Sequence, residues 1–374
     1  MTRDLYISSF APTLGTGRAL RTYTCVRALA ELGPLDLAYV PLGGEGPSPE
    51  YERIDGLAFH EIRPSRGARR ARTYLGTRLR GVPKQYAKGV SPELIEVGER
   101  LAGAPGRGRV VLGDLHASVA MLAVARRRPV IYNAHNVEST YRHAGHGKRI
   151  WTHVAIRRLE MRLLRIASEC WMVSRPDMDA AAALVPEATL RYVPNVVDVE
   201  AIHPVPVNPN GTTVMMVADF AYAPNRSGLA FLADAVMPAV WRSVPDARLR
   251  LVGRGLGNEQ ATDPRIDVAG FVDDLGGAYA SADCVVVPLL EGAGTPLKFV
   301  EALAYQVPVV ATPLAARGLE VQPGEHYLEG HDSERFAAAV TEVLHGRAGE
   351  MPLAARRLAE AEYSISSLKA RITA

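Results

Sequence analysis

The chain has 374 residues, of which 48% are hydrophobic and 22% charged, with a formal net charge of +3 at pH 7. This length exceeds what one hydrophobic core usually supports, so two domains are expected; the composition excludes a disordered chain, and the small charge argues against wholesale nucleic-acid binding. The three cysteines lack disulfide or metal-site spacing, and neither a signal peptide nor a membrane-spanning apolar run is evident, so a cytoplasmic protein is expected.

Short apolar runs alternate with helical patterns along the whole chain. In the first half, strands are predicted at 4–10, 35–40, 57–62, 109–114, 129–135 and 170–174, and the clearest helices at 18–32 and 149–168. In the second half, strands are predicted at 212–219, 248–253, 284–289 and 307–312, and helices at 227–241, 296–305 and 333–345. Near-continuous apolar strands between helices are typical of parallel sheets that are buried on both faces. Segment 193–211 is rich in Pro and Asn and is predicted to link two Rossmann-like domains.

The first candidate site is "APTLGTGRALR", directly after the first strand. Ligands of open α/β sheets bind beyond the carboxyl ends of strands, and a helix N-terminus offers amides to an anion. The predicted binding residues are Gly15, Thr16, Gly17 and Arg18, with Arg21 adding charge. The motif is neither a complete G-x-G-x-x-G nor a P-loop, so a plain strand-to-helix turn is the alternative.

Polar clusters follow two further strands. "GDLHASVA" places Asp114 and His116 at one strand end, and "YNAHNVESTYRH" places His135 and Glu138 at the next. A single histidine is more often structural or solvated than functional, but two at consecutive strand ends are candidates for substrate contact. Their spacing does not resemble a zinc site.

The segment "SRPDMDAAAAL" contains a D-x-D pattern, Asp177 and Asp179, of the kind that binds a metal–diphosphate in some sugar-nucleotide enzymes. Ser174 can also cap a helix that has Pro176 and both acids in its first turn, where acids complement the helix dipole. We expect the capped helix, and no metal site is predicted.

Two loops of the second domain carry polar residues after strands. Asp219, Asn225 and Arg226 are expected on a loop that leads into a helix, a position suited to phosphate, with a plain polar loop as the alternative. Gly253 and Arg254 follow the next strand and could face the ligand cleft.

The stretch "EGAGTPLKFVEALAYQVPVVAT", residues 291–312, has the most unusual pattern. Thr295 is expected to cap a helix with Pro296 at its first position. Lys298 then lies in the first turn, where the helix dipole disfavours a cation, and Glu301 interrupts an apolar run. A phosphate held by Lys298 and the loop amides would resolve both difficulties, with Glu301 accepting hydrogen bonds from sugar hydroxyls. The alternative is an accidental pair that bridges to another element. The predicted binding residues are Gly294, Thr295, Pro296, Leu297, Lys298 and Glu301.

Two basic segments stand out in the first domain. Residues 63–81 hold seven Arg and no acid, and residues 148–165 hold six basic residues, one acid and Trp151. Such segments can lie on an anionic membrane surface, which would place the protein at the inner membrane face. A solvated face or an anionic soluble acceptor is the simpler alternative.

Together these motifs resemble the retaining GT-B glycosyltransferases of family 4. The resemblance covers nearly the whole chain in "GTGRALR", "HNVE", "VSRPDMD", "APNRSG", "LVGRG" and above all the block from "VAGFVDDLGG" to "VPVVAT". It implies an α/β fold in which two Rossmann-like domains face each other across a cleft. The expected domains are 1–195 for the acceptor, 196–355 for the nucleotide sugar, and a tail, 356–374, that can cross back to the first domain.

The resemblance also implies the reaction. A sugar would pass from a UDP-, GDP- or dTDP-sugar to a hydroxyl of a small molecule, glycan or lipid-linked acceptor, with retention and without a metal or other cofactor. It implies that Glu301 binds the ribose and that His116 and His135 position donor sugar and acceptor. The groups that would offset the charge of the diphosphate are Lys298, Arg18, the amides of Gly15 to Gly17 and Arg226. The family signature has an acid where this chain has Ala293, while "GAGTPLK" is similar to a subgroup with a Gly-rich loop followed by Leu-Lys.

Three other functions stay open at this stage. A GT-B sugar-nucleotide epimerase or hydrolase would use the same donor site, and a non-catalytic scaffold would bind the donor alone. An NAD-dependent oxidoreductase is weaker, because no complete dinucleotide fingerprint follows the first strand.

Overall fold

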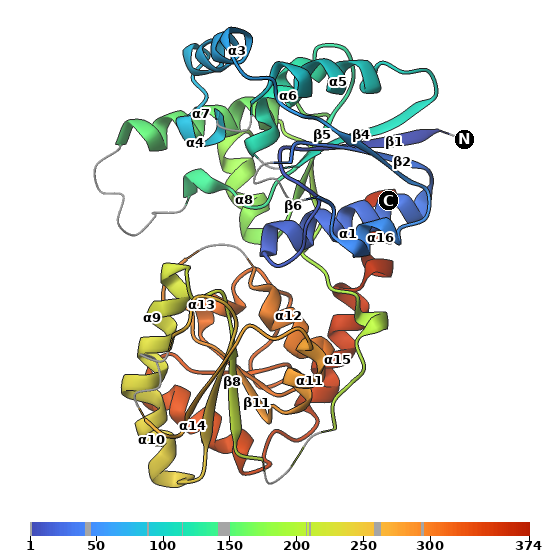
Figure 1. Cartoon of the computed structure of the whole chain (residues 1–374). Coiled ribbons are helices and arrows are strands. Elements are labelled where there is room, and N and C mark those ends of the chain that lie inside the picture. Colours follow the sequence, from blue (N-terminus) through green and yellow to red (C-terminus); the bar gives the residue numbers. More distant parts are fainter. Residues whose placement is uncertain are drawn as a thin grey trace. The chain divides into compact units, whose positions relative to one another are not determined.

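The computed structural model describes residues 2–41, 46–87, 90–113, 115–140, 150–206, 208, 211–257, 263–292 and 295–374. The chain divides into two compact units, the first formed by Met1–Asn195 with Leu368–Ala374 and the second by Val196–Ser367. Each unit contains one parallel β-sheet with helices on both faces (Figure 1). The fold class expected from the sequence, α/β with two Rossmann-like domains, is confirmed.

The sheet of the first unit has seven strands in the order β3-β2-β1-β4-β5-β6-β7. The strands are β1 (Arg3–Ser8), β2 (Leu35–Tyr39), β3 (Leu57–Glu61), β4 (Arg107–Gly113), β5 (Ile131–Asn133), β6 (Glu169–Met172) and β7 (Leu190–Tyr192). The helices are α1 (Gly17–Leu32), α2 (Pro49–Glu52), α3 (Ala68–Leu79), α4 (Lys84–Ala87), α5 (Pro92–Ala102), α6 (Ser118–Val124), α7 (Ile150–Ile166) and α8 (Arg175–Leu184), with short 3-10 turns at η1 (Leu115–Ala117) and η2 (Glu138–Thr140). The central strands are buried because side chains on both of their faces pack against helices.

The second unit has six strands in the order β10-β9-β8-β11-β12-β13. The strands are β8 (Thr213–Val217), β9 (Arg248–Val252), β10 (Ile266–Gly270), β11 (Cys284–Val287), β12 (Val309–Ala311) and β13 (Leu328–Glu329). The helical elements are η3 (Val199–Ala201), α9 (Ala223–Phe231), the π-helical η4 (Leu232–Val236), α10 (Met237–Ser243), α11 (Leu275–Ala280), α12 (Leu297–Ala304), α13 (Pro313–Ala316), α14 (Ser333–Leu344) and α15 (Met351–Glu362). A separate apolar core fills this unit.

The last helix, α16 (Ile365–Thr373), extends into the part of the chain that packs with the first unit. Lys369 forms an ion pair with Glu31 of α1 at 2.7 Å, and the Arg109 guanidinium donates to the carbonyl of Ile372 at 3.2 Å. Figure 1 shows α16 beside α1. None of the helices in the described ranges is both long and apolar enough to cross a bilayer.

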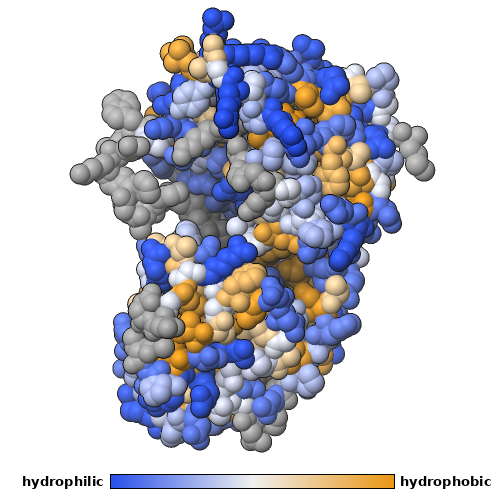
Figure 2. Space-filling model, viewed as in Figure 1, coloured by the Kyte–Doolittle hydropathy of each residue, from blue (hydrophilic) through white to orange (hydrophobic). Residues whose placement is uncertain are grey.

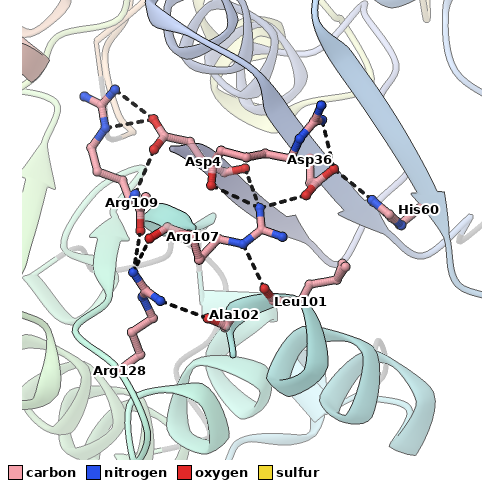
Figure 3. Close-up of polar contacts among 10 residues, drawn as sticks. Asp4, Asp36, His60, Leu101, Ala102, Arg107, Arg109 and Arg128 are labelled. Atoms are coloured by element: carbon pink, nitrogen blue, oxygen red, sulfur yellow. Dashed lines mark hydrogen bonds and ion pairs between the residues drawn. The ribbon is translucent and has the colours of Figure 1, made fainter. Parts of the chain in front are cut away.

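A charged network ties the first residues of β1, β2 and β4 together, at the edge of the sheet opposite the strands' carboxyl ends (Figure 3). The Arg107 guanidinium lies 2.7 Å from the Asp36 carboxylate and donates to the carbonyls of Asp4 and Leu101. Burial opposes ionisation of Asp36, but hydrogen bonds from His60 and Arg107 hold the pKa of this carboxyl below its usual value. We interpret this network as structural, because ligands of such sheets bind at the carboxyl ends of the strands and this network lies at their amino ends.

Candidate sites at the carboxyl ends of the two sheets

The topological switch point of the first sheet lies between β1 and β4, which are neighbours in the sheet but not in sequence. Chain connections run in opposite directions from such a pair, and the divergence of the two loops leaves a crevice for ligands. The loop after β1 carries Gly15 with φ 99°, a conformation that favours glycine. Thr16 caps α1 by accepting a hydrogen bond from the Ala19 amide at 3.2 Å. Residues 15–18 are exposed at this edge.

His116 follows β4 and lies at the same switch point. The Ser9 hydroxyl donates to the His116 carbonyl at 2.9 Å, which connects the loops after β1 and β4. The His116 ring packs edge-on against Phe10 and Tyr86, with centroid distances of 4.8 and 4.9 Å. Arg18 places its guanidinium 4.8 Å from the centroid of the Phe10 ring. The structure therefore brings His116 and Arg18 to the same aromatic side chain. Asp114 lies outside the described residues.

Arg21 does not contribute charge to this edge, which corrects the expectation from the sequence. Its side chain is only 2% exposed and donates to the Val193 carbonyl at 2.8 Å and to Asn195 at 3.3 Å. Burial lowers the pKa of Arg21. Arg21 lies one turn into α1, and its side chain points into the core of the unit rather than toward the carboxyl ends of the strands. The sequence spacing of Arg18 and Arg21 does not reveal this difference.

His135 follows β5, the next strand in the sheet, and two buried carboxylates hold the loop that carries it. The Asp177 carboxylate accepts from the Val137 amide at 3.1 Å, and the Glu160 carboxylate accepts from the Ser139 amide at 3.0 Å. The cap predicted at Ser174 is confirmed, since its hydroxyl accepts from the Asp177 amide at 3.1 Å. Asp177 thus has a structural partner in the loop that follows β5.

The sequence pattern did not predict a role for Glu160, which is the one acid of a basic segment. Its side chain is 2% exposed, and burial raises its pKa to about 7. The available signal was an acid flanked by Leu159 and Met161 on the buried side of α7.

The second sheet has its switch point between β8 and β11, and α12 begins in the loop after β11. The helix starts at Leu297, with Pro296 at the N-cap position and no side-chain cap. The expectation that Thr295 caps the helix is therefore wrong by one residue, because Pro296 takes an extended backbone conformation, ψ 110°, rather than a helical one. Gly294 and Ala293 lie outside the described residues.

Lys298 lies in the first turn of α12, and its ammonium group donates to the Asn225 side-chain oxygen at 2.8 Å. Asn225 in turn donates to the Asp219 carbonyl at 2.7 Å, so the loop after β8 and the helix after β11 are connected at the switch point. Burial lowers the pKa of Lys298 to about 8, although the nearby Glu301 and Asp219 favour its charged form. A partly dehydrated cation at a helix N-terminus is an arrangement that an anionic ligand would stabilise.

Glu301 lies one turn deeper in α12 and uses a different partner. The Tyr279 hydroxyl donates to one oxygen of the Glu301 carboxylate at 3.2 Å. Tyr279 is fully buried and stacks on Tyr305, with ring centroids 4.3 Å apart and planes at 13°. Burial raises the pKa of Glu301, against the effects of Tyr279 and Lys298. The carboxylate is therefore fixed through one oxygen, which leaves the other for a hydroxyl of a ligand.

Asn225 and Arg226 lie in the first turn of α9, not on a loop as expected from the sequence, because Pro224 allows the helix to begin at Ala223. The exposed Arg226 donates to the carbonyls of Phe220 and Ala221 at 3.0 and 2.6 Å. In this conformation the guanidinium supports the loop after β8.

Gly253 and Arg254 have structural partners of their own. Gly253 has φ 139°, and a Cβ at this position would lie 1.7 Å from the Ala218 carbonyl oxygen, so only glycine fits. Arg254 stacks on the Phe271 ring, 4.6 Å from its centroid. Glu291 accepts a hydrogen bond from the Ser227 hydroxyl of α9 at 3.0 Å.

Comparisons with known proteins show what the second unit and the whole fold are similar to. Residues 211–346 match the family model described as Glycosyl transferases group 1. The phosphatidyl-myo-inositol mannosyltransferase of Mycobacterium leprae is 32% identical over 165 residues, which cover 41% of this chain and 43% of that protein. The matched region thus spans less than half the length of this relative.

Two solved structures are similar over the whole chain. Sucrose-phosphate synthase from Thermosynechococcus elongatus superimposes with a TM-score of 0.73 at 16% identity, covering 100% of this chain and 98% of that one. Anabaena HepE in complex with UDP and glucose superimposes with a TM-score of 0.69 at 14% identity, with the same coverage. The second unit is therefore similar to the glycosyl transferases group 1 domain, and the chain as a whole has the GT-B fold of two Rossmann-like domains.

Proposed function

We propose that the protein is a glycosyltransferase that moves a sugar from a nucleotide-diphosphate donor to an acceptor hydroxyl, with retention at the anomeric carbon and without a metal. The observation that carries this proposal is the pairing of Lys298 with Asn225 at the carboxyl edge of the second sheet, with Glu301 one turn further along the same helix. A cation, a helix N-terminus and a fixed carboxylate in this order suit a diphosphate followed by a ribose.

In this proposal the donor diphosphate binds the Lys298 ammonium and the first amides of α12, while Glu301 accepts hydrogen bonds from the ribose. Among the candidate bases we favour uracil, because the similar structure of Anabaena HepE contains UDP and glucose. The donors to be tested are therefore UDP-sugars first, then GDP- and dTDP-sugars.

The reaction breaks the bond between the anomeric carbon and the donor diphosphate oxygen, and the acceptor oxygen forms its new bond on the same face of the sugar. The acceptor proton passes to the leaving diphosphate, so no protein base is required. Lys298 offsets the negative charge that develops on the leaving group, a kind of stabilisation that is often the largest contribution to catalysis. His116 and His135 would position the donor sugar and the acceptor, and Arg18 with the amides of Gly15 to Gly17 would add positive charge for the diphosphate.

The acceptor is proposed to be a hydroxyl compound that carries a lipid, since the relative from Mycobacterium leprae is named a phosphatidyl-myo-inositol mannosyltransferase. The Arg-rich α3 supports contact with an anionic membrane, because Leu75 and Leu79 lie one turn apart and are 59% and 80% exposed. Figure 2 shows hydrophobic residues among hydrophilic ones at the end of the first unit where Figure 1 places α3. Absence of co-sedimentation with anionic vesicles would remove this part of the proposal.

The test is the release of nucleoside diphosphate from a panel of UDP-, GDP- and dTDP-sugars, measured with and without an acceptor mixture. We expect release from one donor to increase when an acceptor is present, with an α-linked product from an α-linked donor by NMR. Epimerised donor without release would indicate an epimerase, and equal release with and without acceptor would indicate a hydrolase. Binding without any turnover would indicate a scaffold; each of these three results contradicts transfer.

A further inference from the structure

We propose that the first unit contains a second anion site, in a pocket between α3, α5, α6 and α7, which binds the phosphate group of a phosphate ester. The pocket has a volume of about 130 Å³, and three arginines, Arg80, Arg126 and Arg162, line it together with Glu99 and apolar side chains. We call it the arginine pocket. It is independent of the proposed glycosyl transfer, because its residues belong to helices and helix ends rather than to the carboxyl ends of the strands.

The three arginines come from separate parts of the chain. Arg80 directly follows α3, Arg126 follows the end of α6, and Arg162 lies in the C-terminal part of α7. Figure 1 shows these helices grouped in one part of the first unit. Tertiary packing, not a local run of charge, therefore brings these three exposed arginines together around one pocket.

Within the described residues these three arginines have no acidic partner, whereas several other arginines of this unit do. Arg69, Arg107, Arg109 and Arg191 each form an ion pair with a carboxylate. For Arg80, Arg126 and Arg162 the described residues provide no carboxylate within 4.0 Å. The one acid of the lining, Glu99, lies 3.5 Å from Arg127, so part of its charge is already offset. Like charges around one hollow repel each other, and a bound anion would relieve that repulsion.

The size and lining of the arginine pocket narrow the class of ligand. A volume of about 130 Å³ is far below the ~300 Å³ at which pockets for drug-sized ligands begin. This size suits a single phosphate group better than a nucleotide sugar. Guanidinium groups match phosphate geometry with paired hydrogen bonds. Ile95, Val119 and Leu122 form an apolar wall beside the charges, suited to the carbon skeleton of an ester.

The same phosphate ester chemistry occurs in soluble metabolites and in lipid headgroups, so the experiment has two arms. The full-length protein is titrated calorimetrically with glycerol 3-phosphate, and it is sedimented with phosphatidylcholine vesicles with and without phosphatidic acid. Both arms use the wild type, the double variant Arg126→Gln/Arg162→Gln, and Arg157→Gln. Arg157 is exposed on α7 but does not line the pocket, so this variant controls for loss of positive charge on the same helix.

We expect the double variant to bind at least about tenfold more weakly than the wild type in one arm, with the Arg157→Gln variant unchanged. Loss in the calorimetric arm identifies a soluble phosphate ester, and loss in the vesicle arm alone identifies a lipid headgroup. The proposal is overturned if the wild type binds neither probe, if the double variant binds as the wild type does, or if Arg157→Gln weakens binding equally. Circular dichroism of the double variant and of Arg157→Gln verifies that both proteins retain the fold.

Discussion

Replacing Lys298 with Met should weaken nucleotide binding much more than it changes the free energy of unfolding. The reason is that the buried ammonium group is unfavourable in the free protein, whereas an anionic ligand would stabilise it. Methionine keeps the length and apolar stem of the side chain and removes the ammonium group. The substitution removes the hydrogen bond to Asn225 and the cation at the N-terminus of α12. It leaves the Tyr279–Glu301 hydrogen bond in place.

The expected change in stability follows from the pKa of Lys298, which burial lowers from 10.5 to about 8. Holding the group charged at neutral pH therefore costs at most about 3 kcal/mol, at about 1.4 kcal/mol per pH unit, and less because the side chain is partly exposed. Losing the charged hydrogen bond to Asn225 costs about 1.5–3 kcal/mol. These effects nearly cancel, so the free energy of unfolding should stay within about 2 kcal/mol of the wild type.

The expected change in binding is larger. A charged hydrogen bond to a phosphate contributes about 1.5–3 kcal/mol, so the dissociation constant of a nucleoside diphosphate should rise about tenfold to hundredfold. Calorimetric titration with UDP, GDP and dTDP measures this change, and Lys84→Met, at an exposed position of α4, is the control.

The pH dependence of stability provides a second measurement on the same variant. Between about pH 8 and 10.5 the unfolded chain still holds the Lys298 proton and the folded protein does not, so the free energy of unfolding rises with pH over this window. The Met variant should lack this contribution. Unchanged nucleotide binding by the Met variant, in a protein that is folded, would refute the assignment of Lys298 to the diphosphate.

Three further predictions concern other residues. Tyr279→Phe removes the hydrogen bond that fixes Glu301, so the preference of the protein for ribonucleotides over their dideoxy forms should fall severalfold, measured by calorimetry; an unchanged preference would show that Glu301 needs no such support. Gly253→Ala should lower the free energy of unfolding by more than about 1 kcal/mol, since its Cβ would meet the Ala218 carbonyl. Gly76→Ala in α3, where a Cβ has free space, should raise the free energy of unfolding by up to about 1 kcal/mol. Chemical denaturation that ranks the two variants in the opposite order would contradict this packing. Glu160→Gln should remove a fall in stability between about pH 4.5 and 7, because over this range the folded protein retains the Glu160 proton that the unfolded chain loses; a pH profile identical to the wild type would contradict the burial of that carboxyl.

The sequence predicted the central strands of both sheets and the edge strand β3, and it missed three other strands at sheet edges. β7, β10 and β13 are edge strands, and most of their residues are only partly buried, so they lack the continuous apolar run that identified β1, β8 and β11. Edge strands are covered on fewer sides, and the pattern that signals burial is therefore weak in them.

The candidate sites show the same division between local and tertiary information. The cap at Ser174 and the first-turn position of Lys298 depend on residues close in sequence, and both were predicted. The partners of Lys298 and Arg21 lie 73 and 172 residues away, so no local pattern indicates that one lysine meets Asn225 and that one arginine is buried. The arginine pocket likewise joins residues that are distant in sequence, so no local pattern predicts it.

The most direct test of the donor site compares nucleoside diphosphates with their 2′,3′-dideoxy forms in the wild type and in Glu301→Gln. Calorimetry should give a preference of about tenfold or more for the ribose form in the wild type, since a ribose hydroxyl can donate to the Glu301 carboxylate oxygen that Tyr279 does not use. In Glu301→Gln this preference should largely disappear, while the contribution of the diphosphate through Lys298 remains. A ribose preference that persists unchanged in Glu301→Gln would contradict the proposed site.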